Sequence, residues 1–334
     1  MAMRSEIPLS LLELASVREG ESIHSTLNHS RHYAQAADQL GFTRFWLAEH
    51  HNMEGIASSA TSVLIGYIAA NTERLRVGSG GIMLPNHPPL VIAEQFGTLA
   101  SLYPDRIDLG LGRAPGTDIV TARALRRDLN AADDFASEVR ILEQLLAPDT
   151  PMQRLKAIPG SGTQVPIWML GSSLYSAHLA AAKGLPYAFA GHFAPKHMRE
   201  AAQIYRNNFT PSPCLDKPYF MLGMPVIVAD TKATADKLAT TVYQRILALF
   251  RGEPMYLKPP VDSMEGLWSA QEEFGVKEFL ALASIGTPSQ VETTLNYLAA
   301  EIGIDEFMFT IDIFDTHLRI GILEMLAGLN IKRF

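Results

Sequence analysis

Phe45-Trp46-Leu47-Ala48-Glu49-His50-His51 places three ionisable residues directly after four apolar ones. An apolar run of this length is typical of a buried strand, and the abrupt change to polar residues marks the strand's end. In parallel α/β barrels, the chemistry gathers where the strands run out into loops. The stretch therefore predicts a catalytic barrel with its active site at the carboxyl ends of the strands.

The rest of the chain repeats this pattern, because short apolar runs alternate with helical patterns along nearly its whole length. The predicted strands are residues 7–14, 45–48, 75–79, 107–111, 167–170, 187–190, 221–228 and 306–311. The predicted helices between them include residues 25–40, 59–71, 90–102, 173–183, 196–207 and 231–249. Eight such strands predict an α/β fold, a single (β/α)8 TIM barrel domain over residues 1–334.

Two proline- and glycine-rich segments, near residues 147–166 and 251–275, interrupt the even spacing of the strands and helices. In a barrel, such segments are loop insertions. The first precedes a strand and should lie on the N-terminal face, whereas the place of the second does not follow from the pattern.

Composition narrows the class of protein. The chain has 334 residues, 47% hydrophobic and 19% charged, which is ordinary for a globular enzyme. It has no run of about 20 apolar residues, so we expect no membrane partner. A net charge of −7 without a long basic cluster argues against nucleic acid. We expect a small-molecule substrate.

The same sequence bears on location. We find no export signal at the start of the chain, and the single cysteine, Cys214, has no partner for an internal disulfide. We therefore expect a cytoplasmic protein.

Polar and glycine residues follow most of the predicted strands, as a barrel with its active site on one rim requires. They are Glu49-His50-His51, Ser79-Gly80-Gly81, Gly112-Arg113-Ala114-Pro115-Gly116, Gly171-Ser172-Ser173, Gly191-His192, and Asp312 with Asp315 and His317.

The paired histidines suggest either a metal site or proton transfer. Because side chains alternate across a strand, adjacent His50 and His51 should point to opposite sides and should not bind one ion together. We predict no metal site. A neutral imidazole suits acid–base chemistry near pH 7, and Glu49 would fix its tautomer. The competing interpretation is that one histidine is a buried hydrogen-bonded residue and the other belongs to the loop.

Gly171, Ser172 and Ser173 open a predicted helix, where amide donors and hydroxyls favour a phosphate group. Arg113, in a glycine-bracketed loop, adds a charge that binds phosphate in a bidentate way. The alternatives are that a serine only caps the helix and that Arg113 pairs with Asp118. Gly80 and Gly81 would let a flat ligand approach the backbone, although a tight turn explains them equally well.

Three blocks carry a family resemblance. Leu47-Ala48-Glu49-His50-His51-Asn52, the stretch from Gly78 to Pro88, and Tyr103-Pro104-Asp105-Arg106-Ile107-Asp108-Leu109-Gly110-Leu111-Gly112-Arg113 resemble the bacterial luciferase-like flavin-dependent monooxygenase family. The similarity extends from about Ile7 through the final helix. It implies a (β/α)8 barrel that binds a flavin, usually FMN, at the C-terminal rim.

The resemblance also implies roles for single residues. His50 matches the family's active-site histidine, placed near the flavin ring. Ser79, Gly80 and Gly81 match the segment that lies against the ring, where family members often have a non-proline cis peptide, so we predict one at Gly80-Gly81 or next to it. The phosphate-binding positions fall on Arg113, Ser172, Ser173 and Ser176, together with the Gly171 turn.

We therefore expect a monooxygenase that uses reduced FMN and O2, with the reduced FMN delivered by a separate flavin reductase. We expect Trp46, Met83 and Phe193 to line the barrel mouth and an insertion to cover it, because the reaction must exclude water. Two rivals share the fold: a deazaflavin (F420)-dependent hydride-transfer oxidoreductase and a non-catalytic flavin-binding protein. The family commonly dimerises, so we expect a homodimer through helices within residues 59–71 and 90–102.

Overall fold

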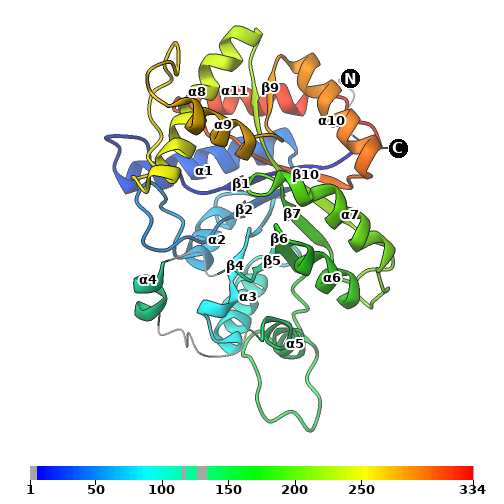
Figure 1. Cartoon of the computed structure of the whole chain (residues 1–334). Coiled ribbons are helices and arrows are strands. Elements are labelled where there is room, and N and C mark those ends of the chain that lie inside the picture. Colours follow the sequence, from blue (N-terminus) through cyan, green and yellow to red (C-terminus); the bar gives the residue numbers. More distant parts are fainter. Residues whose placement is uncertain (1–5, 115–117, 126–133, 334) are drawn as a thin grey trace.

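The fold is a closed barrel of parallel strands with helices on its outside, a (β/α)8 TIM barrel (Figure 1). The computed structural model describes residues 6–114, 118–125 and 134–333, so Pro115 and Gly116 of the predicted rim loop lie outside the described residues. The barrel closes because β10 pairs in parallel with both β1 and β8. The predicted fold class is confirmed.

Each of the eight predicted strands is present, with ends within two residues of the predicted ones. They are β1 (Leu9–Glu13), β2 (Arg44–Leu47), β3 (Arg76–Ser79), β5 (Ile107–Gly112), β6 (Ile167–Gly171), β7 (Tyr187–Ala190), β8 (Phe220–Val228) and β10 (Glu306–Thr310). Two short strands were not predicted: β4 (Ile82–Met83) pairs with β5, and β9 (Ser284–Gly286) pairs with the end of β8.

Helices cover the outside of the barrel. They are α1 (Ile23–Leu40), α2 (Thr61–Ala69), α3 (Pro89–Leu102), α4 (Ile119–Ala124), α5 (Phe135–Leu146), α6 (Leu174–Lys183), α7 (Met198–Asn207), α8 (Lys232–Arg251), α9 (Ala270–Phe279), α10 (Pro288–Ile302) and α11 (Thr316–Ala327), with short 3₁₀ helices η1 (Leu84–Asn86) and η2 (Pro195–His197). Within the described ranges, no helix combines the length and apolar character that crossing a membrane requires.

Local signals place the ends of these helices. The Ser22 hydroxyl accepts a hydrogen bond from the Ser25 amide and caps α1, which ends at Gly41 with φ of 82°. A capping box between Thr287 and Gln290 opens α10.

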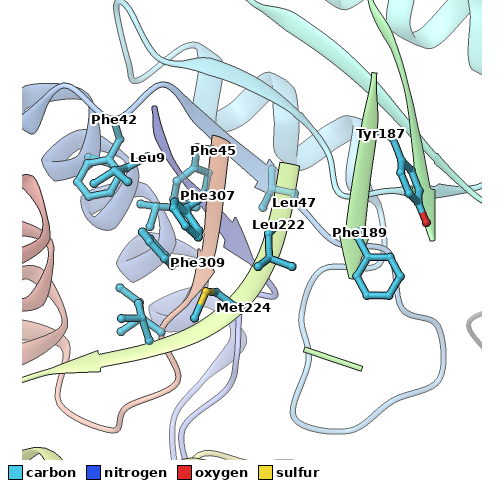
Figure 2. Packing of buried hydrophobic residues seen from close by; sticks show 14 of the residues in the cluster. Leu9, Phe42, Phe45, Leu47, Tyr187, Phe189, Leu222, Met224, Phe307 and Phe309 are labelled. Atoms are coloured by element: carbon cyan, nitrogen blue, oxygen red, sulfur yellow. The ribbon is translucent and has the colours of Figure 1, made fainter. Parts of the chain in front are cut away.

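Alternation along the strands divides the core into two layers. Outward-facing side chains such as Phe45, Phe307 and Phe309 pack between the barrel and its helices (Figure 2). Inward-facing side chains fill the barrel with a second cluster that includes Leu12, Trp46, Trp168, Met221 and Met308. The strands therefore present every second residue to the interior.

The second insertion lies across the loops that follow β1 and β2. The Leu257 amide donates to the Val17 carbonyl at 2.8 Å, and the Met255 amide donates to the Glu54 carbonyl at 3.0 Å. This segment therefore sits at the C-terminal end of the barrel. The first insertion joins the end of α5 to the start of β6.

A layer of buried charge closes the opposite end of the barrel. Asp108 of β5, fully buried, accepts hydrogen bonds from Arg44 and Arg76 at 2.6 Å each and from the Trp46 indole at 3.1 Å. Arg44 also donates to Glu306, which is itself buried and bonded to Ser10. The inward-facing polar groups at this end therefore satisfy one another.

The Asp108 cluster gives a test of the fold. Asp108→Asn keeps the side chain's shape but leaves two guanidinium groups without their shared counter-charge, so we expect the free energy of unfolding to fall by about 3 kcal/mol or more. Urea denaturation measures this change. Asp149→Asn, which removes an exposed partner of Lys156, is the control and should leave stability nearly unchanged. Equal stability of both variants would show that the cluster contributes nothing.

Candidate active site

A cavity of about 270 Å³ opens at the C-terminal rim of the barrel, where the sequence predicts the site. Its lining residues come from strand ends and the loops that follow them. They include Leu12, Trp46, Gly80, Gly81, Met83, Gly112, Arg113, Leu170, Gly171, Ser172, Ser173, Tyr175, Ser176, Ala188, His192, Phe193, Met221 and Met308.

The floor of the cavity is apolar and rigid. Trp46 is fully buried and packs edge-on against Trp168, with ring centroids 5.1 Å apart. Trp46, Met83 and Phe193, which we expected at the barrel mouth, all line the cavity. Few polar groups in this part of the lining could bind water, so water would compete only weakly with a ligand here.

Gly80 and Gly81 form one wall. Their peptide bond is cis, as the resemblance led us to predict. A Cβ atom on Gly81 would lie 2.7 Å from the Gly110 carbonyl oxygen, so only glycine lets this segment pass so close to β5. The wall therefore presents backbone to the cavity.

Ser79, which the resemblance places with the two glycines at the cofactor, turns its side chain to β5, and its role at the cofactor stays a prediction. Its side chain is fully buried, and its hydroxyl donates to the Gly110 carbonyl at 2.8 Å. Ser79 does not line the cavity among the described residues. In this structure it joins β3 to β5 and positions the glycine wall.

The other end of the cavity is polar. Ser173 is the N-cap residue of α6, yet its side chain makes no capping hydrogen bond, so the alternative that it only caps the helix does not hold for Ser173. The helix start therefore presents amide groups and a hydroxyl to the cavity. The Arg113 guanidinium lies over the Tyr175 ring, 4.3 Å from its centroid.

Ser176 is less available than the resemblance implied. Its hydroxyl donates to the Ser173 carbonyl at 2.7 Å and lies 3.0 Å from the Tyr187 hydroxyl. The side chain lines the cavity but is already engaged in holding the first turn of α6.

Glu49 holds two histidines beside the cavity. One carboxylate oxygen lies 2.7 Å from the Nε2 atoms of both His51 and His87, and the other accepts the Met83 amide at 3.1 Å. Burial opposes the charge on Glu49, but these hydrogen bonds outweigh it and keep its pKa below the ordinary value. Glu49 therefore fixes the segment that carries Met83.

Glu49, His51 and His87 have the residue types of a metal site. Alternation along β2 separates His50 from His51 but carries no information about His87, which reaches Glu49 from the end of η1. Ligands of a tetrahedral zinc ion, each about 2.0–2.1 Å from the metal, lie roughly 3.3 Å apart. The observed 2.7 Å separations are those of hydrogen bonds, so we interpret the group as a hydrogen-bonded triad. The absence of a metal site stays a prediction.

His50 takes no part in the hydrogen bonds of this triad and does not line the cavity among the described residues. Burial and the nearby charge of Arg245 lower its pKa to about 4. Burial likewise lowers the pKa of His192, which does line the cavity, to about 4. Both imidazoles are therefore neutral at pH 7, the form that accepts a proton.

Comparisons with known proteins identify similar chains. A family model described as luciferase-like monooxygenase matches residues 10–306. The luciferase-like monooxygenase of Escherichia coli K12 is 49% identical over 96% of each chain, and the N-acetyl-S-alkylcysteine monooxygenase of Bacillus subtilis is 31% identical, covering 90% of this chain and 92% of that one.

Solved structures give the same picture. The apo structure of MsnO8 is 34% identical, with a TM-score of 0.85, and covers 98% of this chain and 100% of that one. Two structures of lower identity share the fold alone. They are the oxygenating constituent of 3,6-diketocamphane monooxygenase with FMN, 16% identical with a TM-score of 0.71, and an F420-dependent secondary alcohol dehydrogenase, 13% identical with a TM-score of 0.72; each covers 98% of this chain and 100% of its own.

The buried histidines give a pH prediction. His50 and His192 should titrate with midpoints near pH 4 in the folded protein, because burial disfavours the charged imidazole. In the unfolded chain a histidine titrates near pH 6.5, so stability should fall as pH drops from about 6.5 through 4.

NMR titration of the imidazole resonances, assigned with His50→Gln and His192→Gln, measures the midpoints. Each variant should also lose less stability than the wild type between pH 6.5 and pH 4, because glutamine takes up no proton. Midpoints near 6.5 in the folded protein would contradict the burial of both rings.

Proposed function

The chain belongs to the luciferase-like monooxygenase family, and we propose that it uses reduced FMN and O2 to oxygenate a small organic substrate. One observation carries the choice of cofactor: a single cavity joins apolar walls and a glycine wall to a polar end at Arg113 and the start of α6. We further propose that a separate reductase supplies the reduced FMN. The single exposed cysteine fits a cytoplasmic enzyme.

FMN, like the cavity, has a flat part and a charged part. Its ring is flat and largely apolar, which fits the Gly80-Gly81 wall and the Trp46 side. Its phosphate is a dianion, which fits Arg113 and the N-terminus of α6 with Ser172 and Ser173. When bound, reduced FMN would supply the two electrons with which one oxygen atom of O2 enters the substrate and the other leaves as water.

The chain's own residues would position the cofactor and substrate, exclude water from the cavity and transfer a proton. Trp46 and Met83 exclude water from the inner end, and the second insertion covers the neighbouring loops. His50 is neutral at pH 7, and it lies close enough to His192 that a proton on one ring would disfavour a proton on the other. We propose that His50 holds or moves a proton beside the reacting atoms, as a general acid or base.

The cofactor choice is tested by adding FMN or F420 to the purified chain and following absorbance and fluorescence. We expect FMN to bind, and the protein with reduced FMN in air to consume oxygen and form an oxygenated product. Arg113→Ala should weaken FMN binding about tenfold or more, because a phosphate loses a charge-assisted contact. Arg154→Ala, an exposed arginine in the first insertion, is the matched control.

Three outcomes would count against the proposal. Binding of F420 without FMN would indicate a deazaflavin-dependent hydride transfer. Binding of FMN without oxygen consumption or product would indicate a flavin-binding protein. An unchanged affinity in Arg113→Ala would remove the phosphate site.

We also propose a homodimer through α2 and α3. Val63 and Tyr67 of α2 and Val91 and Leu102 of α3 are exposed apolar side chains on neighbouring helices, and Val63 is 69% exposed. An isologous contact between two copies would bury this surface. The partner is a second copy of the chain.

Analytical ultracentrifugation at micromolar concentration tests this proposal. We expect a dimer that Val63→Asp converts to monomer, because the change places a charge in the contact. Val120→Asp is the matched control, since Val120 is also 69% exposed but lies on α4. A monomeric wild type, or equal dissociation by both changes, would exclude this interface.

A further inference from the structure

Four side chains lie close together beyond the strand ends, at the C-terminal rim. Ser16, His50, His192 and Asp312 follow β1, β2, β7 and β10, respectively. The Ser16 hydroxyl donates to Asp312 Oδ1 at 3.3 Å. Charges on Asp312 and His50 act on His192, which lines one end of the cavity.

Arg245 enters this group from α8. It is 1% exposed, and its Nη1 atom donates to the Ser16 hydroxyl at 2.6 Å and lies 2.7 Å from Asp312 Oδ1. Its charge also acts on His50. The second insertion packs along the same helix, because Thr241 and Gln244 donate to the Lys258 and Pro259 carbonyls. Arg245 is thus held in place from two sides.

The remaining donors of Arg245 are unused. Its Nε and Nη2 atoms are buried, and neither has a hydrogen-bond partner among the residues that the structure describes. These two atoms form one edge of the planar guanidinium, with parallel N–H bonds whose spacing matches the two oxygens of a carboxylate. The Nδ1 atom of His50 is likewise buried without a partner in the described ranges.

Buried polar groups are nearly always paired, and an unpaired charged donor is costly. A bound molecule with acceptor oxygens would remove this cost. The donors are nitrogen atoms, and the edge carries positive charge, so an anionic acceptor fits better than a neutral one. Because neither nitrogen atom lines the cavity, such a molecule reaches them only when the side chains that cover them shift.

We propose that the Nε/Nη2 edge of Arg245 binds a carboxylate group of the substrate, beside His50 and at the His192 end of the cavity. This inference rests on the proposed monooxygenase function and names its substrate class, a small organic acid. Asp312 and Ser16 are positioning residues in this arrangement, because they hold the opposite side of the guanidinium.

Binding of hexanoate and of its uncharged match hexanamide to the full-length protein without flavin tests the proposal by NMR titration. We expect hexanoate to bind about tenfold or more tightly than hexanamide. Arg245→Lys should remove most of this preference, because lysine keeps the charge but lacks the two-donor edge. Arg199→Lys is the matched control, since Arg199 already uses the corresponding edge on Glu301 at the surface.

Asp312→Asn provides a second test that does not alter the arginine. It removes the internal counter-charge of Arg245, so hexanoate should bind more tightly than to the wild type, a change that a purely structural role does not predict. Equal binding of the acid and the amide would contradict the proposal and indicate that only water satisfies the edge. Weaker hexanoate binding by Asp312→Asn would also contradict it.

These measurements need no cofactor, so they separate the two conclusions. FMN binding without a preference for the acid would overturn the carboxylate site alone. A preference for the acid without FMN binding would leave the site in place and overturn the proposed reaction.

Discussion

Alternation of side chains along β2 is the constraint on which the rest of the structure depends. Arg44, Trp46 and Ala48 face the barrel interior. Arg44 bonds to the buried Asp108, Trp46 packs against Trp168 and lines the cavity, and Ala48 packs in the interior cluster. Phe45 and Leu47 face the helices. Past the strand's end, Glu49 bonds to His51, and His50 lies within reach of the charge of Arg245. The start of β2 thus carries Arg44 of the buried charge layer, and the segment after its end carries the candidate site residues Glu49 and His50.

The cavity has different chemistry at its two ends. Near α6, Arg113 and the open helix start favour a phosphate group. Near the His192 end are two imidazoles that are neutral at pH 7, those of His50 and His192, and the buried guanidinium of Arg245, whose charge acts on His50. The apolar middle separates the two ends, so a cofactor and a substrate would be held by different groups. This division is the physical basis of the proposed reaction.

The sequence was sufficient for the barrel and for part of the site. Each strand carries its own apolar run and polar end, so local pattern located all eight, and the resemblance located the cis Gly80-Gly81 peptide. The sequence pattern did not reveal that His87 bonds to Glu49 or that Arg245 bonds to Ser16 and Asp312. Arg245 is one arginine among helical residues, and only the closed barrel brings it to Ser16 and Asp312, 229 and 67 positions away. The motif that assigned Ser79 to the cofactor does not show which way its side chain points, and the hydroxyl bonds to the Gly110 carbonyl.

The central claim is that this cavity holds FMN with its ring on the glycine wall and its phosphate at α6. A crystal structure of the protein soaked with FMN measures this directly. We expect density for the ring against Gly80-Gly81 and for the phosphate within hydrogen-bond distance of Arg113, Ser172 or Ser173. Density for FMN outside the cavity, or with its phosphate at the His192 end, would contradict it.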